Sequence, residues 1–183
     1  MHSGDADSRP VNRLSAAMWG GAALLLSLPW IAMRLTDEVD WSPRDFAVFG
    51  TMLFVACSAY ELATRTTGNR AYRAGAGLAV AAGFLLVWVD LAVGIVGSEA
   101  NPANLMFAGV PVVAMAGAAI ARGRPRGMAC ALAATALAHV SVAAFALLRA
   151  SGDLPRLAAL SGFFVALWLG SAWLFRMAVR STG

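Results

Sequence analysis

Six long stretches of mostly apolar residues run along the chain, and short polar segments separate them. A helix needs about 20 such residues to cross the hydrocarbon core of a membrane. Because lipid offers no hydrogen-bond partner to backbone N–H and C=O groups, spanning segments of this kind must be helical. The pattern therefore predicts an all-α fold, a polytopic membrane bundle of six transmembrane helices. The expected spans are approximately 14–33, 46–64, 74–97, 103–121, 127–148 and 157–175, in one transmembrane domain (14–179) between an N-terminal tail (1–13) and a C-terminal tail (180–183).

Two of the expected helices begin with recognisable capping residues. Ser42 is followed by Pro43 and, three residues after the serine, by Asp45. This order is typical of a capping box with proline in the first helical turn. Asn101 and Pro102 have the same relationship ahead of the fourth span. Both segments are therefore expected to start helices.

The composition supports a lipid environment and argues against nucleic-acid binding. Hydrophobic residues make up 60% of the chain and charged residues only 13%, whereas a soluble domain is nearer half and a quarter. The net charge of +4 comes from 14 arginines without any lysine. These arginines lie at the ends of apolar stretches, not in a cluster on a polar surface, as nucleic-acid binding requires. Cys57 and Cys130 lie in separate apolar stretches and are expected to be buried and free.

The arginines also predict how the chain is oriented. Cytoplasmic loops of membrane proteins carry an excess of Lys and Arg. With the N-terminus in the cytoplasm, the inner side holds Arg9, Arg13, Arg65, Arg70, Arg73, Arg122, Arg124, Arg126, Arg176 and Arg180, and the outer side holds Arg34, Arg44, Arg149 and Arg156. Both termini are therefore expected in the cytoplasm.

Glu61 is the first of three ionisable residues within the apolar stretches. Such residues are costly in lipid and are candidates for function. Glu61 precedes Arg65 by four residues, so a pair along one helix is one interpretation. The other is a polar face that lines a wet cavity, shared with Ser58.

Asp90 and His139 are the other two ionisable residues. Asp90 shares a glycine-containing face with Gly83, so it is expected to face protein. It either pairs structurally, with Arg44 or Arg149, or handles a proton, cation or substrate. His139 either forms a hydrogen bond to a neighbouring helix or joins Glu61 and Asp90 in a proton ladder.

Two sets of loop residues are candidate binding groups. Oxygen ligands of the kind that hard cations prefer gather in the outer loops, where the alternative is an ordinary solvated surface. They are Asp37, Glu38, Asp40, Glu99, Asn101 and Asn104. Arginines of the inner loops are expected to bind anionic lipid headgroups. They are Arg65, Arg70, Arg73, Arg122, Arg124 and Arg126.

Several segments together resemble a family of small bacterial six-helix inner-membrane proteins of unknown function. They are Thr36–Trp41, Tyr60–Leu62, Gly68–Arg73, Trp88–Glu99, Asn101–Asn104 and Arg124–Gly127. The resemblance covers about residues 14–148 at the level of pattern. It implies a multi-pass protein of a bacterial inner (plasma) membrane and carries no activity or site residue with it.

Two classes of function remain open from the sequence. The first is a non-enzymatic accessory subunit or a small transporter or channel-like unit, in a homo-oligomer or a larger membrane complex. The second is a membrane-embedded enzyme that acts on a lipid or quinone. The sequence contains no HExxH, GxSxG or CxxC motif, which favours the first class. No catalytic residue, cofactor or metal site is predicted.

Overall fold

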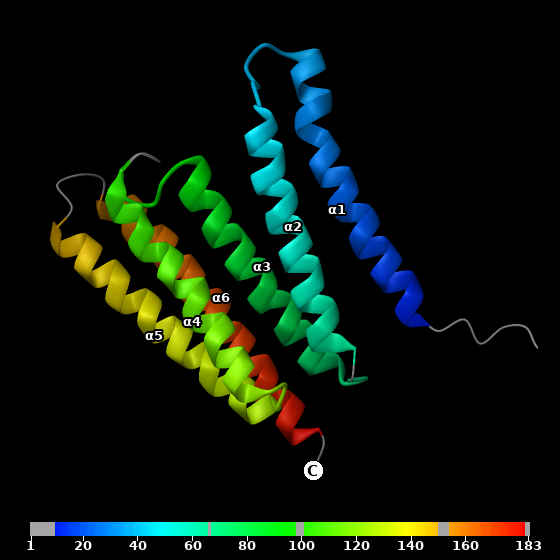
Figure 1. Cartoon of the computed structure of the whole chain (residues 1–183). Coiled ribbons are helices and arrows are strands. Elements are labelled where there is room, and N and C mark those ends of the chain that lie inside the picture. The colour runs from blue at the N-terminus through cyan, green and yellow to red at the C-terminus, as the bar shows by residue number, and fades with distance from the viewer. Residues whose placement is uncertain (1–9, 66, 98–100, 150–153, 182–183) are drawn as a thin grey trace, which may run out of the picture. The chain divides into compact units, whose positions relative to one another are not determined.

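The computed structural model describes residues 10–65, 67–97, 101–149 and 154–181, which form helices and no strand. The helices are α1 (Pro10–Leu35), α2 (Pro43–Thr64), α3 (Arg70–Ala92), the 3-10 turn η1 (Pro102–Asn104), α4 (Leu105–Ala121), α5 (Pro125–Arg149) and α6 (Leu154–Arg180). Figure 1 shows these elements along the chain. The all-α prediction is confirmed.

Six of the described helices are long and apolar enough to cross a membrane. Many of their large apolar side chains are exposed, with Ile120 at 82% and Leu148 at 86%. A soluble protein rarely exposes large continuous apolar surfaces of this kind. The chain therefore has the features of a multi-pass membrane protein.

The chain divides into two compact units, residues 1–61 and 62–183. In the first unit, the predicted capping box at the start of α2 is confirmed. The backbone N–H and the hydroxyl of Ser42 both donate to Asp45 Oδ2 at 2.8 Å, and the Asp45 N–H donates to Ser42 Oγ at 3.3 Å. The rings of Trp19 on α1 and Phe54 on α2 lie 5.6 Å apart, so aromatic packing joins these two helices.

The second unit contains α3, α4, α5 and α6, coloured from green to red in Figure 1. Helix α5 packs against α4 and α6, and α3 packs against α6 and α4. The largest completely buried side chains of this unit are Trp168, Phe107, Phe164 and Phe175. The turn between α4 and α5 is tight because Arg122 (φ 49°) and Gly123 (φ 74°) adopt left-handed backbone conformations.

Helix α3 ends at Ala92, before the end of the predicted span 74–97. Gly94 and Gly97, expected on the helix, both have φ of 73° instead, a conformation that glycine adopts without steric cost. The backbone N–H groups of Ile95 and Val96 then donate to Asn104 Oδ1 at 3.1 and 2.8 Å. This side chain replaces the hydrogen bonds that a longer helix would have made.

Candidate functional site

His139 lies on α5 in the centre of the four-helix unit and is completely buried. The Phe107 ring contacts it edge-on at 5.5 Å, and the Phe164 ring stacks on it at 5.9 Å. Within the part of the chain that the structure describes, neither ring nitrogen of His139 has a hydrogen-bond partner. The expected hydrogen bond to a neighbouring helix is therefore wrong, because the neighbouring helices present aromatic rings at this level.

Asp90 lies in the last turn of α3, and its buried Oδ1 has no hydrogen-bond partner. Among the described residues the expected pairing with Arg149 is not seen, and the Arg149 guanidinium lies 4.9 Å from the centre of the Phe145 ring. Arg156 approaches the same end of α3 but donates to the backbone carbonyl of Gly94, at 3.3 Å. Pairing with Arg44, in the other unit, stays a prediction.

The contacts between α3 and α6 show that the two helices run antiparallel. These contacts are Ser171 with Gly75, Trp168 with the space above Gly83, and Arg156 with Gly94. Asp90 lies on α3 between Gly83 and the turn at Gly94 that follows the helix, and Ser161 lies between Trp168 and Arg156 on α6. The register therefore places Asp90 and Ser161 at about the same depth.

The described part of the four-helix unit thus holds several buried polar atoms without hydrogen-bond partners, on α3, α5 and α6. They are Asp90 Oδ1, His139 Nδ1, His139 Nε2, Ser161 Oγ and Trp168 Nε1. Together they include donors and acceptors, and two of them, Asp90 Oδ1 and Ser161 Oγ, lie at about the same depth. Ser161 was not singled out as a polar candidate from the sequence, because only the α3–α6 register places it near Asp90. Trp168 was also missed; it lies against Gly83, about two helical turns from Asp90.

Glu61 has a different environment, in the first unit. Its Oε2 accepts a hydrogen bond of 3.0 Å from the Trp19 indole N–H on α1. The predicted proton ladder needs Glu61 together with Asp90 and His139, which belong to the other unit, so it stays a prediction. The link to Trp19 was missed because the two residues are 42 positions apart.

The outer loop residues divide between surface and structural roles. Asp37, Glu38 and Asp40 are exposed, and Glu99 lies outside the described residues. The Asn101 oxygen accepts from the Ala103 N–H at 3.0 Å, which confirms the predicted cap. Asn104 is buried and its oxygen already accepts two backbone hydrogen bonds, the number that an amide oxygen can take.

No group of three or more His, Cys, Asp or Glu side chains that could hold a metal ion occurs among the described residues. Cation binding by the outer loop residues stays a prediction. The two asparagines are poor candidates for ligands, because their side-chain oxygens are already used in the backbone contacts given above.

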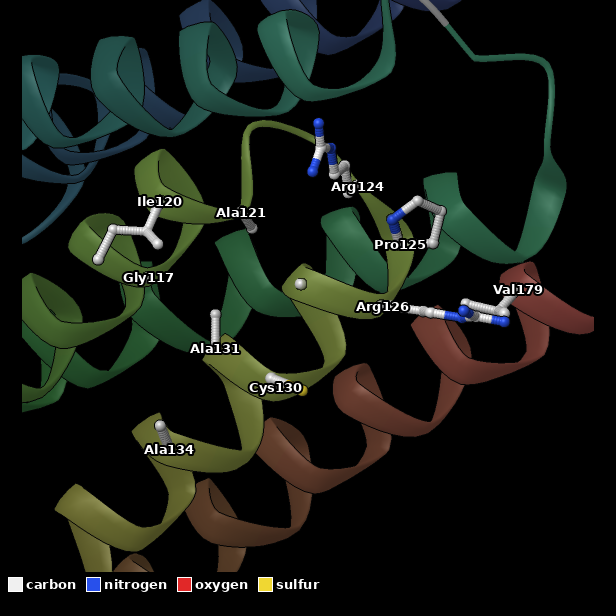
Figure 2. Close-up of a pocket in the computed structure, with 11 residues that line it drawn as sticks. Gly117, Ile120, Ala121, Arg124, Pro125, Arg126, Cys130, Ala131, Ala134 and Val179 are labelled. Atoms are coloured by element: carbon white, nitrogen blue, oxygen red, sulfur yellow. The ribbon is translucent and has the colours of Figure 1, made fainter.

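An open groove of about 870 Å³ lies at the arginine-rich end of the four-helix unit (Figure 2). Small residues of α4 and α5 form its floor, with Arg124 and Arg126 at one end and Val179 of α6 beside them. Cys130 also lines the groove and is exposed. The expectation that it is buried is therefore wrong, whereas Cys57 is buried and free as expected.

The other inner-loop arginines, Arg65, Arg70 and Arg73, do not line this groove. Arg122 lines a smaller depression beside it, together with Arg124. The sequence predicted a cationic end but not a groove, because the groove depends on how α4 and α5 approach each other.

No family model, no curated protein and no solved structure matches this chain. The resemblance to a bacterial inner-membrane family therefore stays an expectation. The six apolar helices indicate a multi-pass membrane protein.

Proposed function

We propose that this protein is a non-enzymatic accessory subunit of a larger membrane complex. The observation that carries the proposal is the complete burial of His139 between the rings of Phe107 and Phe164. A catalytic histidine must reach the proton that it transfers. Aromatic rings on two sides and zero exposure favour a structural role for this residue.

The hydrogen-bonded polar side chains of the interior support the same role. Thr135 donates to the backbone carbonyl of Ala131 at 2.9 Å, and Ser171 donates to that of Gly75 at 2.8 Å. Asn104 accepts from the end of α3. Each of these groups therefore stabilises a helix or a helix contact and does not converge with others on a substrate position, as an active site requires.

A small transporter is the second candidate, and the unpartnered buried polar atoms of Asp90, His139 and Ser161 favour it. Buried polar groups in proteins are nearly always hydrogen-bonded, and ionisable ones within a membrane often mark a proton or ion path. Asp90 and Ser161, at similar depth on α3 and α6, would be the first groups on such a path. Transport would require water to reach them.

One pair of measurements separates these roles. The full chain is extracted from its own membrane into lipid nanodiscs, and the mass and subunit composition are determined by native mass spectrometry. An accessory subunit is expected in an assembly of fixed stoichiometry with a different chain, and Asp90→Asn and His139→Leu should leave that composition unchanged. The purified chain in proteoliposomes should carry no proton flux.

The opposite results would overturn the proposal. A chain that is recovered only by itself, with a proton flux that Asp90→Asn abolishes, would establish a transporter. Turnover of a lipid or quinone by the purified chain would establish an enzyme.

A further inference from the structure

The groove at the arginine-rich end of the four-helix unit combines two chemically different regions. Arg124 and Arg126 lie at one end, and the floor is formed by Gly117, Ala131 and Ala134. Figure 2 shows Arg126 extended toward Val179, with Ala131 and Ala134 further along α5. The groove is therefore cationic at its mouth and apolar along its length.

We propose that this groove is a binding site for one anionic phospholipid, with the phosphate at Arg124 and Arg126 and the upper part of an acyl chain along α5. The proposal concerns a specific site and does not depend on the accessory role. It goes beyond a general attraction of inner arginines to the membrane surface, because it assigns the lipid to one groove.

The length of the groove fits the upper part of a lipid. Ala134 lies nine residues after Pro125, at the start of α5, so the apolar floor extends about 13 Å along the helix axis. A segment of this length, starting at a helix end, passes from the headgroup level into the hydrocarbon. The change from arginine to alanine along α5 follows the change from phosphate to acyl chain.

Helices α4 and α5 approach each other closely through the small residues of the floor. A Cβ added at Gly117 would lie 2.6 Å from the Ala131 Cβ, and one added at Gly127 would lie 2.9 Å from the Ala121 Cβ. Such contacts bring the two backbones together. Larger side chains at these positions would separate the helices, and the open space along the seam would be lost.

The mouth of the groove carries the positive charge of two arginines. Arg124 and Arg126 are exposed, and among the described residues neither guanidinium forms a salt bridge or hydrogen bond. The first turn of α5 adds the positive end of the helix dipole. Arginine binds phosphate oxygens in a planar, bidentate geometry, so charge and geometry both suit a phosphodiester.

A phospholipid uses the whole groove, whereas other anions use only part of it. Free phosphate would contact the arginines and leave the apolar floor empty. An acidic protein segment would be excluded from the part of the floor that lies at hydrocarbon depth. The orientation predicted from the arginines also places the groove in the cytoplasmic leaflet, where anionic lipids are enriched.

Native mass spectrometry of the full chain, released from detergent after incubation with phosphatidylglycerol or phosphatidylcholine, tests the site. One phosphatidylglycerol is expected to stay bound to the wild type, with phosphatidylcholine bound far less. Since each arginine near an anionic lipid contributes to affinity, Arg124→Gln with Arg126→Gln should weaken binding about thirtyfold. Ala134→Leu, which fills the floor without changing the charge, should also weaken it.

Two control variants make the result specific to the groove. Arg176→Gln with Arg180→Gln removes the same charge near the same end of the unit, from exposed α6 residues that do not line the groove. Ala144→Leu adds the same bulk to an exposed position of α5 outside it. Both should retain the bound phosphatidylglycerol, and circular dichroism should show unchanged helix content in all variants.

Three results would overturn the proposal. Equal losses in the Arg124/Arg126 and Arg176/Arg180 variants would mean diffuse attraction to a charged surface. Displacement of the lipid by millimolar inorganic phosphate, with Ala134→Leu unaffected, would mean a site for a free anion. Equal retention of phosphatidylcholine would mean that the arginines do not select the lipid.

Discussion

Ser171 on α6 donates a hydrogen bond of 2.8 Å to the backbone carbonyl of Gly75 on α3. Both residues are buried, and a Cβ added at Gly75 would lie only 3.2 Å from the Phe175 ring. The absence of a side chain at Gly75 therefore lets α6 come close enough for a serine hydroxyl to reach the α3 backbone. This contact fixes the two helices close together at the end of the unit opposite Asp90 and Ser161.

Ser171→Ala is predicted to lower the free energy of unfolding by about 0.6–1.7 kcal/mol, the range measured for hydrogen bonds between membrane helices. The expected loss of stability is small because the Gly75 carbonyl remains part of helix α3 after the substitution. Unfolding in mixed micelles with increasing sodium dodecyl sulfate measures it. Ser141→Ala is the control, since Ser141 is exposed and donates within its own helix. Equal effects in the two variants would contradict a role for the α3–α6 contact.

Gly117→Ala is predicted to lower the free energy of unfolding by about 1–3 kcal/mol, because overpacking forces a backbone shift between α4 and α5. The new methyl group would lie 2.6 Å from the Ala131 Cβ. Gly109→Ala on the same helix has nothing within 4 Å and should cause no loss. The same micelle unfolding measurement compares the two. If Gly117→Ala left the free energy of unfolding unchanged, the contact between α4 and α5 would be looser than described.

His139→Leu is predicted to leave the free energy of unfolding unchanged or to raise it by about 1–2 kcal/mol. The reason is that the substitution removes two buried nitrogens without partners and keeps most of the volume between Phe107 and Phe164. His139→Ala should instead lower it by about 2–4 kcal/mol, because it leaves a cavity. A marked loss in His139→Leu would mean that the ring nitrogens bind water or a solute in the membrane.

Glu61→Leu is predicted to weaken the contact between α1 and α2 by about 1 kcal/mol, because the half-buried Trp19 indole N–H loses its acceptor. Glu61→Gln keeps an oxygen acceptor and should retain most of the stability. A double-mutant cycle with Trp19→Phe isolates the pair. If Gln is as damaging as Leu, the negative charge of Glu61 has a further role, as the proton ladder requires.

The helices could be predicted from the sequence because apolar stretches of spanning length allow few other structures. The capping box at Ser42 and Asp45 was predictable for a related reason, since its hydrogen bonds join residues only three apart. The end of α3 could not be predicted, although Gly94 is visible in the sequence. A glycine is tolerated within a membrane helix, and the break depends on Asn104, which replaces the missing helical hydrogen bonds.

The candidate sites were predicted only in part, because their surroundings depend on helix register. His139 and Asp90 could be identified from their cost in lipid. That the neighbours of His139 are aromatic rings, and that Ser161 lies at the depth of Asp90, follows only from the packing of α3, α5 and α6. The groove was also predicted only in part. Its arginines were evident from the sequence, but the close approach of Gly117 and Ala131 was not.

The central claim is that six helices cross a membrane in alternation, with the arginine-rich connections inside. Single cysteines are introduced one at a time into a chain with Cys57→Ala and Cys130→Ala. The positions are Asp37, Gly68, Arg124 and Ser151, which follow spans one, two, four and five. A membrane-impermeant maleimide applied to intact cells labels those that face outward.

Asp37→Cys and Ser151→Cys are predicted to react in intact cells, and Gly68→Cys and Arg124→Cys only after the membrane is permeabilised. The reverse pattern would contradict the assigned orientation. Labelling of Gly68→Cys and Asp37→Cys from the same side would contradict the alternation of the helices across the membrane.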